Sequence, residues 1–575
     1  NPYLYTDPDN PLALPETVMP KGGIYNLTEY MLTSMDFRGT VSYNSDFGKN
    51  GEHIVSLFGG AELNSTDRQY TWFRGWGYQY NNGGVPYLDY RLFKQGQEEN
   101  SVYYSNDFTY YRNLAFFGMA TYSYKGRYTI NGTIRYEGTN KLGKSRNARW
   151  LPTWNVSGAW NAHEEDWWYP TFGKAWSYAS LKGSYSLTAD RGPAGVTNSL
   201  AVFSSFTPFR PSTNASETGI QLYDIENSEL TYEKKHELNI GVAFGFVDNR
   251  VNVEFDWYRR NNYDLIGYVQ TMGVGGQTTK LANDATMQST GCEFTISTVN
   301  IKAKDFKWTT DWIFGWAENE ITKLQSRSQV YQLVNGYGRK QGRPVGALYS
   351  IPFAGLTEEG LPTFYIDADR TQIAGPANYD AIYFQEYENV DYLKYEGTID
   401  PKITGSFGNT FSWKGLKLNV FFTYSFGNVL RLDPLCPVYG SDYSDLTASM
   451  KEMKNRWMIP GDEQITTIPS IATVRQMREI NALNNAYSAY NYSTERVAKG
   501  DFIRLKELSL AYDLPKKVLE GQNAISSFGL KLSATNLWLA YADKKLNGRD
   551  PEYYNSGGVS SPVPRQFTLT VKLGF

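Results

Sequence analysis

The sequence predicts an all-β fold, and within that class a transmembrane antiparallel β-barrel, from three observations. Apolar and polar residues alternate with a period of two in many segments, as they do when the two faces of a strand meet different surroundings. Aromatic residues make up 16% of the chain, yet mean hydropathy is −0.49. No run of about 18 apolar residues is present, so no membrane helix is predicted. Together these features are typical of strands with one face in lipid and one in water.

Length, charge and cysteine content restrict the alternatives. A chain of 575 residues forms either several soluble domains or one large closed sheet. The net charge is −3 and there is no basic tract, so no nucleic-acid partner is expected. The only cysteines, Cys292 and Cys436, lie far apart without spaced partners, which excludes a disulfide-dense scaffold and a thiolate zinc site and leaves their pairing open.

The N-terminal segment differs from the rest of the chain. Residues 1–30 are expected to be a loop leading into the barrel, because the stretch is rich in Pro and Asp. Residues 31–575 are expected to form a C-terminal barrel part with long extracellular loops. The chain opens at Asn1 without an initiator Met, a basic segment or an apolar segment, so no signal peptide is predicted and part of the polypeptide is expected upstream.

A hairpin over 115–136 shows the expected unit. One face of its first strand carries Phe116, Gly118, Ala120, Tyr122 and Tyr124, and the matching face of its second strand carries Tyr128, Ile130, Gly132, Ile134 and Tyr136. The three-residue loop Lys125-Gly126-Arg127 keeps the two sets in register.

Later segments repeat this pattern. Segments 238–246 and 251–257 predict a second hairpin, with Asn239, Glu254 and Asp256 on its polar face. Segments 306–316 and 416–426 alternate in the same way. A soluble sandwich explains one such strand equally well, but repetition in roughly sixteen runs favours the barrel.

The last strand carries the clearest lipid-facing pattern. Its apolar face consists of Phe567, Leu569, Val571, Leu573 and Phe575. A charge on the lipid face costs roughly 2–4 kcal/mol near the bilayer midplane, so Lys572 is expected on the opposite face.

Turn lengths predict which end of each strand lies outside the cell. Short turns near Lys125 and Val247 are expected at the periplasmic end, and long segments at the extracellular end. Extracellular loops are predicted at 64–106, 191–232, 326–345, 367–400 and 433–499.

Motifs over nearly the whole length resemble the SusC-like branch of the TonB-dependent transporters of Bacteroidetes. The first group is Arg149-Trp150, Ser157-Gly158-Ala159-Trp160, Leu181 to Tyr185, Asn227 to Leu230 with Glu233, Asp256-Trp257-Tyr258 and Asp264-Leu265. The middle group is Arg343 to Gly346, Tyr349, Ala354-Gly355-Leu356, Gly360-Leu361-Pro362, Gly405-Ser406-Phe407 and Phe421-Phe422. The most specific group is Gly500 to Tyr512, Leu514-Pro515, Asn536-Leu537 and Asp550-Pro551-Glu552. The terminal Phe575 is similar to the assembly signal of outer-membrane barrels.

This resemblance implies a barrel of about 22 strands closed by an N-terminal plug, of which roughly the last sixteen strands are present here and the plug is not. It implies TonB-dependent active import of an oligosaccharide or oligopeptide across the bacterial outer membrane. A SusD-like surface lipoprotein would act as a lid, and the TonB complex would engage the missing N-terminal part. Membrane lipid would surround the barrel, and the chain would be the C-terminal portion of a longer polypeptide.

The residues support neither a catalytic site nor a metal site. The only histidines are His53, His163 and His236, and no nucleophile elbow, zinc helix or phosphate loop is present. The run 163–166 contains ligand types, but adjacent loop residues seldom converge on a metal. Asp367 and Asp369 open a calcium-like loop that lacks its later ligands, so a turn is expected. We therefore expect neither an enzyme nor a cofactor.

Aromatic residues in the first long loop are the candidate substrate-binding site. The candidates are Trp72, Trp76, Tyr78, Tyr80, Asn82 and Tyr87. Exposed rings at this density suit stacking on sugar faces or lining a peptide cleft, with the amide as a polar partner. Packing within the loop or an aromatic girdle is the alternative for each ring. Trp167-Trp168-Tyr169 is expected to anchor at the membrane interface, and Tyr-rich loops favour glycans slightly over peptides.

Two other functions remain open on the residues alone. A passive porin or a surface-adhesion barrel needs neither plug nor lid. An outer-membrane hydrolase needs a triad or paired carboxylates at the extracellular rim. A plug domain upstream would separate the importer from the passive barrel.

Overall fold

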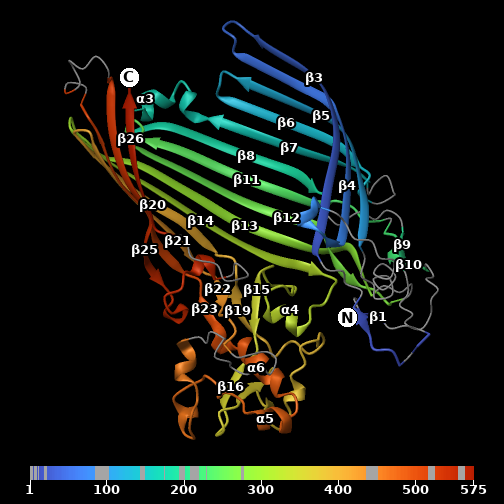
Figure 1. Cartoon of the computed structure of the whole chain (residues 1–575). Helices are drawn as coiled ribbons and strands as arrows, with labels where there is room; N and C mark the ends of the chain where they lie inside the picture. Colours follow the sequence, from blue (N-terminus) through green and yellow to red (C-terminus); the bar gives the residue numbers. More distant parts are fainter. Residues whose placement is uncertain are drawn as a thin grey trace.

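A single large antiparallel sheet dominates the chain (Figure 1). The computed structural model describes residues 4–5, 9–10, 12–17, 22–84, 103–142, 149–173, 175–192, 201–206, 219–227, 229–273, 278–435, 451–515, 518, 525–554 and 564–575. The sheet has fifteen strands, and its strand order is the chain order. The strands are β3 (Gly23–Phe47), β4 (His53–Tyr78), β5 (Tyr104–Tyr124), β6 (Tyr128–Thr139), β7 (Trp150–Asn161), β8 (Trp176–Asp190), β11 (Glu233–Phe246), β12 (Val251–Gln270), β13 (Thr279–Lys302), β14 (Phe306–Leu324), β20 (Ile403–Trp413), β21 (Leu416–Phe426), β24 (Phe502–Asp513), β25 (Ser527–Ala542) and β26 (Gln566–Gly574).

This up-and-down order confirms the predicted all-β barrel class, with fifteen strands where roughly sixteen were expected. Strands β3 and β26 form the two edges of the sheet and are not paired with each other in the described part of the chain. Within the described residues no helix is long and apolar enough to cross a membrane.

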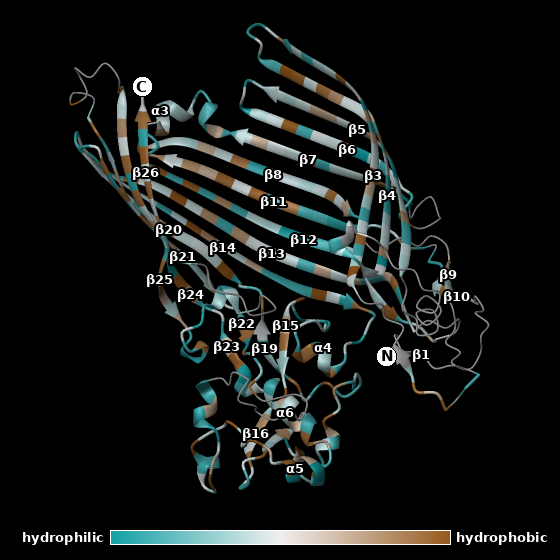
Figure 2. Ribbon diagram, in the orientation of Figure 1, coloured by the Kyte–Doolittle hydropathy of each residue, from teal (hydrophilic) through white to brown (hydrophobic). Residues whose placement is uncertain are grey.

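The predicted registers are confirmed. Tyr124 of β5 faces Tyr128 of β6 across the turn at 125–127, and Ile240 of β11 faces Trp257 of β12. In β26, Phe567 lies on the apolar face and is 70% exposed. Lys572, which pairs with Gly529 of β25, lies on the opposite face, as predicted. The alternation along the strands appears in Figure 2 as bands of opposite hydropathy.

The outer face of the sheet, the face of Phe116 and Ile134, carries an exposed apolar band. Two ring pairs border this band toward the longer loops: Tyr136 stacks on Trp150 at 5.1 Å, and Trp154 packs edge-on against Tyr185 at 5.5 Å. Rings at the ends of an apolar band are typical of a barrel in lipid, where they lie at headgroup level. We call these four residues the extracellular girdle.

Short turns and long connections lie at opposite ends of the sheet, as predicted. The turns at 125–127 and 247–250 lie at the end where the C-terminus is found, and the N-terminus lies at the other end with the long connections (Figure 1). The helix α3 (Trp168–Phe172) lies in a connection at the short-turn end.

Two predicted boundaries are wrong for the same reason. Strand β3 begins at Gly23, within the expected loop 1–30, and β4 continues to Tyr78, within the expected loop 64–106. Residues 64–71 are mostly polar on both faces, so the apolar alternation ends although the backbone pairing continues. Beyond the lipid, both faces of a strand meet water. The strand then no longer shows the alternation of apolar and polar residues by which a strand is predicted.

Three of the predicted extracellular loops fold together into one packed unit. We call residues 325–399, 429–435 and 451–499 the extracellular subdomain. It contains α4 (Val330–Val334), β15 (Ala347–Ser350), β16 (Phe353–Leu356), β17 (Pro362–Tyr365), β18 (Ile373–Ala374), β19 (Lys394–Thr398), β22 (Val429–Arg431), α5 (Val474–Glu479), α6 (Leu483–Asn491) and β23 (Val497–Lys499). Its core includes Leu333, Phe364, Tyr379 and Tyr490, each at most 1% exposed. The segments are therefore a domain with its own core and not open loops.

Small elements and one buried ion pair complete the extracellular end. The short pairs are β1 (Leu4–Tyr5) with β2 (Glu16–Thr17), and β9 (Val202–Phe206) with β10 (Gly219–Asp224). Arg504 of β24, which is buried, contacts Asp550 at 2.5 Å and Glu552 at 2.9 Å. This contact ties the connection between β25 and β26 to the barrel wall, and it joins two of the motifs that carry the family resemblance.

Candidate functional site

The structure divides the predicted aromatic site between the two faces of β4. Trp72 and Trp76 lie on the inner face, the face of Glu62, and Trp76 is only 3% exposed. Tyr78 stacks on Tyr25 at 5.0 Å, and Tyr25 lies on the outer face. Gly77 causes the change of face, because its positive φ of 71° accompanies an irregularity in the pairing.

The remaining candidates add little to an inner site. Tyr80 lies in the short helix η1 (Tyr80–Asn82) and packs edge-on against Tyr78 at 4.6 Å. Asn82 ends that helix, and Tyr87 lies outside the described residues. Trp72 is partly covered by the Arg74 guanidinium, 5.1 Å from its ring. The role of all six residues in substrate binding stays a prediction.

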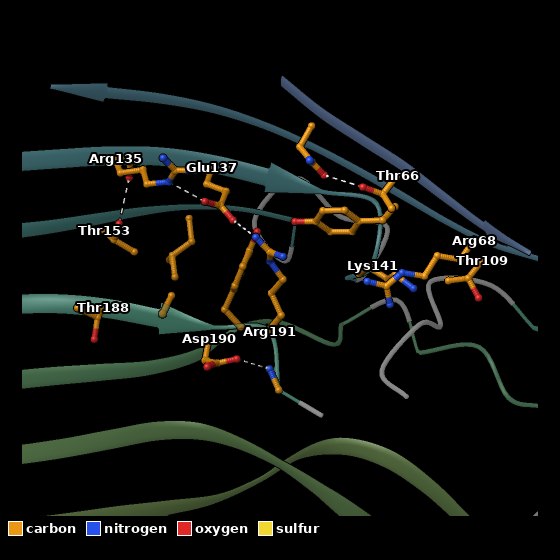
Figure 3. Close-up of a pocket in the computed structure, with 16 residues that line it drawn as sticks. Thr66, Arg68, Thr109, Arg135, Glu137, Lys141, Thr153, Thr188, Asp190 and Arg191 are labelled. Carbon is orange, nitrogen blue, oxygen red and sulfur yellow. Dashed lines mark hydrogen bonds and ion pairs between the residues drawn. The ribbon is translucent and has the colours of Figure 1, made fainter. Parts of the chain in front are cut away.

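A polar cavity opens on the inner face next to these residues, and we call it the mouth pocket. Its volume is about 860 Å³, and its lining comes from β4, β5, β6, β7, β8 and the segments that follow β6 and β8 (Figure 3). It lies beyond the level of the extracellular girdle. Ala61 of β4 pairs with Phe116 of β5, and Phe116 pairs with the girdle residue Tyr136. Thr66 and Arg68 follow Ala61 along β4 and therefore lie on the extracellular side of the girdle. The cavity is therefore at the extracellular mouth of the barrel wall.

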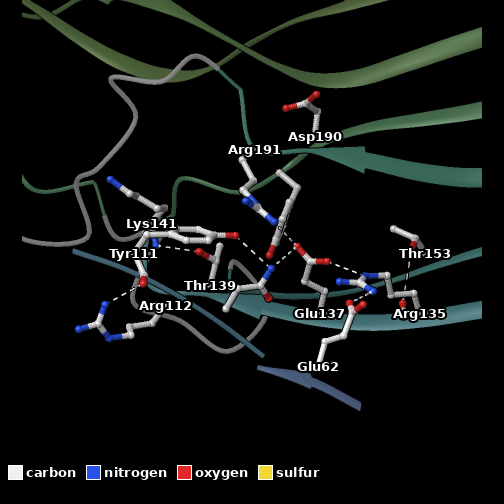
Figure 4. Close-up of polar contacts among 12 residues, drawn as sticks. Glu62, Tyr111, Arg112, Arg135, Glu137, Thr139, Lys141, Thr153, Asp190 and Arg191 are labelled. Atoms are coloured by element: carbon white, nitrogen blue, oxygen red, sulfur yellow. Dashed lines mark hydrogen bonds and ion pairs between the residues drawn. The ribbon is translucent and has the colours of Figure 1, made fainter. Parts of the chain in front are cut away.

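A chain of alternating charges forms the floor of the mouth pocket (Figure 4). Glu137 accepts from Arg135 at 2.7 Å and from Arg191 at 2.6 Å. Arg135 also contacts Glu62 at 2.7 Å, and Glu62 contacts Arg38 of β3 at 3.3 Å. Each carboxylate thus lies between two guanidinium groups, and the chain links β3, β4 and β6 to the segment after β8.

Two tyrosines close the side of the mouth pocket toward β11. The Arg191 guanidinium lies 4.9 Å from the ring of Tyr111. Tyr232, which precedes β11, donates its hydroxyl proton to the Arg149 carbonyl at 3.2 Å. Burial raises the pKa of Tyr232, so its hydroxyl stays protonated at physiological pH.

Basic groups outnumber acidic groups around the mouth pocket. The charged lining residues are Arg68, Arg135, Lys141 and Arg191 against Glu137 and Asp190, a net charge of plus two. Sequence reasoning missed this site because its residues come from strands and segments far apart in the chain. The alternation of polar residues along β4 and β6 predicts an inner face but not the meeting of these side chains.

The residues considered for metal binding have other partners. Glu165 and Asp166 contact Arg127 at 3.2 and 2.5 Å, and Nδ1 of His163 lies 2.9 Å from the Ala179 carbonyl. Asp367 accepts from Thr371 and Gln372 and forms a turn. In the ranges that the structure describes, no three His, Cys, Asp or Glu residues form a group that could hold a metal.

The aromatic run at α3 lies at the periplasmic end. Trp168 is buried and donates its indole N–H to the Trp176 carbonyl at 3.0 Å, while Trp167 and Tyr169 are exposed. The interface role of the exposed pair stays a prediction, and Trp168 packs within this connection.

Comparison with known proteins gives consistent relatives. No known family model matches the chain. TonB-dependent receptor P39 of Formosa agariphila is 24% identical over 590 residues, which cover 95% of this chain and 53% of that protein. TonB-dependent receptor SusC of Bacteroides thetaiotaomicron is 26% identical over 220 residues, covering 37% of this chain and 21% of that protein.

A second receptor of Formosa agariphila, P3, is 25% identical over 564 residues, which cover 93% of this chain and 52% of that protein. The chain therefore spans about half the length of the curated relatives that it matches along most of its own length.

Solved structures show the same fold. The RagAB peptide transporter matches with a TM-score of 0.75 and 22% identity, over 97% of this chain and 58% of that chain. The open-open state of the RagAB peptide importer matches with a TM-score of 0.71 and 23% identity, over 97% and 57% of the two chains.

Proposed function

We propose that this chain, which is similar to TonB-dependent receptors that include SusC, is the barrel part of an active SusC-like importer of the bacterial outer membrane. A nutrient too large for porins would bind at the extracellular mouth, and energy from the inner membrane would drive its release into the periplasm. The observation that carries the proposal is the mouth pocket, a polar cavity on the inner face beyond the girdle. A ligand arriving from outside meets that cavity before it meets the barrel interior.

The partners follow from the family. A SusD-like lipoprotein would cover the extracellular mouth, and the TonB complex would act through a plug carried by the part of such a protein that precedes this barrel. Both partners are proposals, since the chain spans about half the length of its curated relatives.

The substrate is proposed as an oligosaccharide or an oligopeptide. The RagAB transporter, whose fold this chain shares, is a peptide transporter, which supports the peptide class. Hydroxyl and amide side chains in the mouth pocket, such as Thr66, Thr109 and Asn64, support the sugar class because they match the donors and acceptors of sugar hydroxyls.

A test compares accumulation of labelled oligosaccharides and oligopeptides by cells with and without a functional TonB complex. Active import predicts accumulation that stops when TonB is deleted or when the proton-motive force is collapsed. Accumulation that continues under both conditions would support the passive porin instead. The curated relatives are receptors, and release of cleavage products by the pure protein would be needed to revive a hydrolase.

A further inference from the structure

Two cations in the mouth pocket differ from the arginines of its floor. Arg135 and Arg191 both form ion pairs with Glu137, and Arg135 also pairs with Glu62. Arg68 of β4 and Lys141, two residues after β6, form no ion pair and no side-chain hydrogen bond within the part of the chain that the structure describes. Figure 3 shows them together at one end of the cavity.

These two cations influence each other. Burial lowers the pKa of the Lys141 ammonium, and the nearby Arg68 cation lowers it further, while Asp107 acts in the opposite direction without forming an ion pair. Two like charges at one cavity repel each other, and partial desolvation strengthens the repulsion. An anion bound between Arg68 and Lys141 would offset this repulsion.

The surroundings of the pair indicate the rest of the ligand. Thr66, Thr109 and Tyr111 line the same cavity and offer hydroxyl groups, and the ring of Trp72 follows on the same inner face farther from the membrane. Hydroxyl groups beside aromatic faces suit sugar units, which combine hydroxyls with apolar ring faces.

We infer that the mouth pocket binds an anionic oligosaccharide, whose sugar units carry carboxylate or sulfate groups, and that Arg68 and Lys141 determine this specificity. The inference rests on the proposed import function. Guanidinium and ammonium groups form charge-assisted hydrogen bonds to both kinds of anion, and the threonine hydroxyls bind the neighbouring sugar hydroxyls. A neutral oligosaccharide would leave the two cations uncompensated.

The experiment uses the full-length protein and two matched pairs of probes in calorimetric titrations. One pair is a short oligogalacturonate and its methyl ester, and the other is a sulfated oligosaccharide and its desulfated form. We expect the charged member of at least one pair to bind about tenfold more tightly or better, and the preference to shrink as salt is added. A preference for the first pair identifies carboxylates and a preference for the second identifies sulfates.

Variants assign the preference to the two cations. The double substitution R68Q with K141Q should abolish it, whereas R68K with K141R should retain it and so exclude a general loss of structure. Lys304, exposed in the short connection between β13 and β14, provides the matched control K304Q, which should bind like the parent protein.

The following results would overturn the inference. These are equal binding of charged and neutral members in both pairs, a preference that survives R68Q with K141Q, and, in an added titration with an acidic peptide, tighter binding of that peptide than of either charged sugar. Absence of binding by every sugar probe overturns it as well. TonB-dependent accumulation of any other nutrient would then still support the proposed import function, so the two failures are distinguishable.

Discussion

Glu137 is the residue on which the floor of the mouth pocket depends, because its carboxylate lies between Arg135 and Arg191. The substitution Glu137→Gln leaves both guanidinium groups without their shared anion. We expect a loss of about 1–3 kcal/mol in unfolding free energy, the cost of breaking partly buried charge-assisted hydrogen bonds. The measurement is the temperature at which the barrel loses its folded migration on gels. We expect this unfolding temperature to be lower for Glu137→Gln than for the parent protein.

Glu358 provides the control for that substitution. It is exposed in the turn between β16 and β17 and has no side-chain partner among the described residues, so Glu358→Gln should leave the unfolding temperature unchanged. An equal effect of the two substitutions on the unfolding temperature would show that the chain of charges contributes nothing to the stability of the barrel.

Asp367 makes a pH-dependent contribution at a single turn. Hydrogen bonds from the backbone N–H of Gln372 and from Thr371 lower the pKa of the Asp367 carboxyl. A carboxyl whose folded-state pKa is depressed stabilises the fold above its unfolded pKa, near 4, and loses that contribution as pH falls through the folded pKa. Asp367→Ala should therefore raise protease cleavage of the turn at pH 7, and its difference from the parent protein should shrink below about pH 4.

Among the elements of the extracellular subdomain, β22 pairs with β23 and carries a side chain that binds three other segments. Arg431 donates to the carbonyls of Ser493, Val334 and Tyr349, which belong to three separate segments. Burial lowers the pKa of Arg431 to about 10, and the group is still charged at neutral pH. Arg431→Gln should destabilise the subdomain by about 1–3 kcal/mol, because the carbonyls lose their donors.

Limited proteolysis of the extracellular subdomain would detect that loss of stability while the barrel stays resistant. Arg475 is the control, since its exposed pair with Glu479 spans one helical turn of α5 and Arg475→Gln should cost only about 0.3–0.5 kcal/mol. Unchanged cleavage in Arg431→Gln would mean that the apolar core alone holds the subdomain together.

The turn between β11 and β12 contains a strained residue. Val247 has a φ of 53° and begins three consecutive left-handed residues, although its branched side chain disfavours that conformation. Val247→Asn should raise the stability of the barrel by about 0.5–1 kcal/mol, because Asn tolerates the left-handed region. A lower unfolding temperature would show that the Val247 side chain packs usefully in the turn.

The sequence predicted the elements that lie in lipid and missed those above it. Hairpins such as Tyr124 with Tyr128 follow from the apolar alternation that lipid imposes. Residues 64–78 continue β4 in water, where this signal ends. Leu333, Tyr379 and Tyr490 form one core from three separate predicted loops, and no local pattern predicts contacts over such separations. The mouth pocket was missed for the same reason, and two of the predicted rings that the structure describes, Trp72 and Trp76, lie on its face.

At the scale of the whole molecule, the edges β3 and β26 need partners. An open sheet edge is not tolerated in hydrocarbon, because its N–H and C=O groups lack hydrogen bonds there. The 25-residue β3 is a long edge, and we expect further strands to pair with it and with β26. Residues 1–575 expressed alone should therefore fail to give a heat-modifiable barrel, whereas the full-length protein should give one.

Intact mass and N-terminal peptide mapping of the protein from outer membranes test the same expectation. A mass above 65.3 kDa with peptides upstream of Asn1 would agree with closure by further strands. A heat-modifiable barrel from 1–575 alone would instead require β3 and β26 to pair directly.

The length of β3 also sets how far this side of the barrel wall rises above the cell surface. Its 25 residues extend about 80 Å at about 3.3 Å per residue, or about 60 Å in height at a tilt near 40°. An apolar band of about 25 Å accounts for less than half of that height. The wall of β3 and β4 therefore extends well beyond the lipid headgroups. The free end of a long polymer in the surrounding medium can contact this wall before the polymer approaches the bilayer.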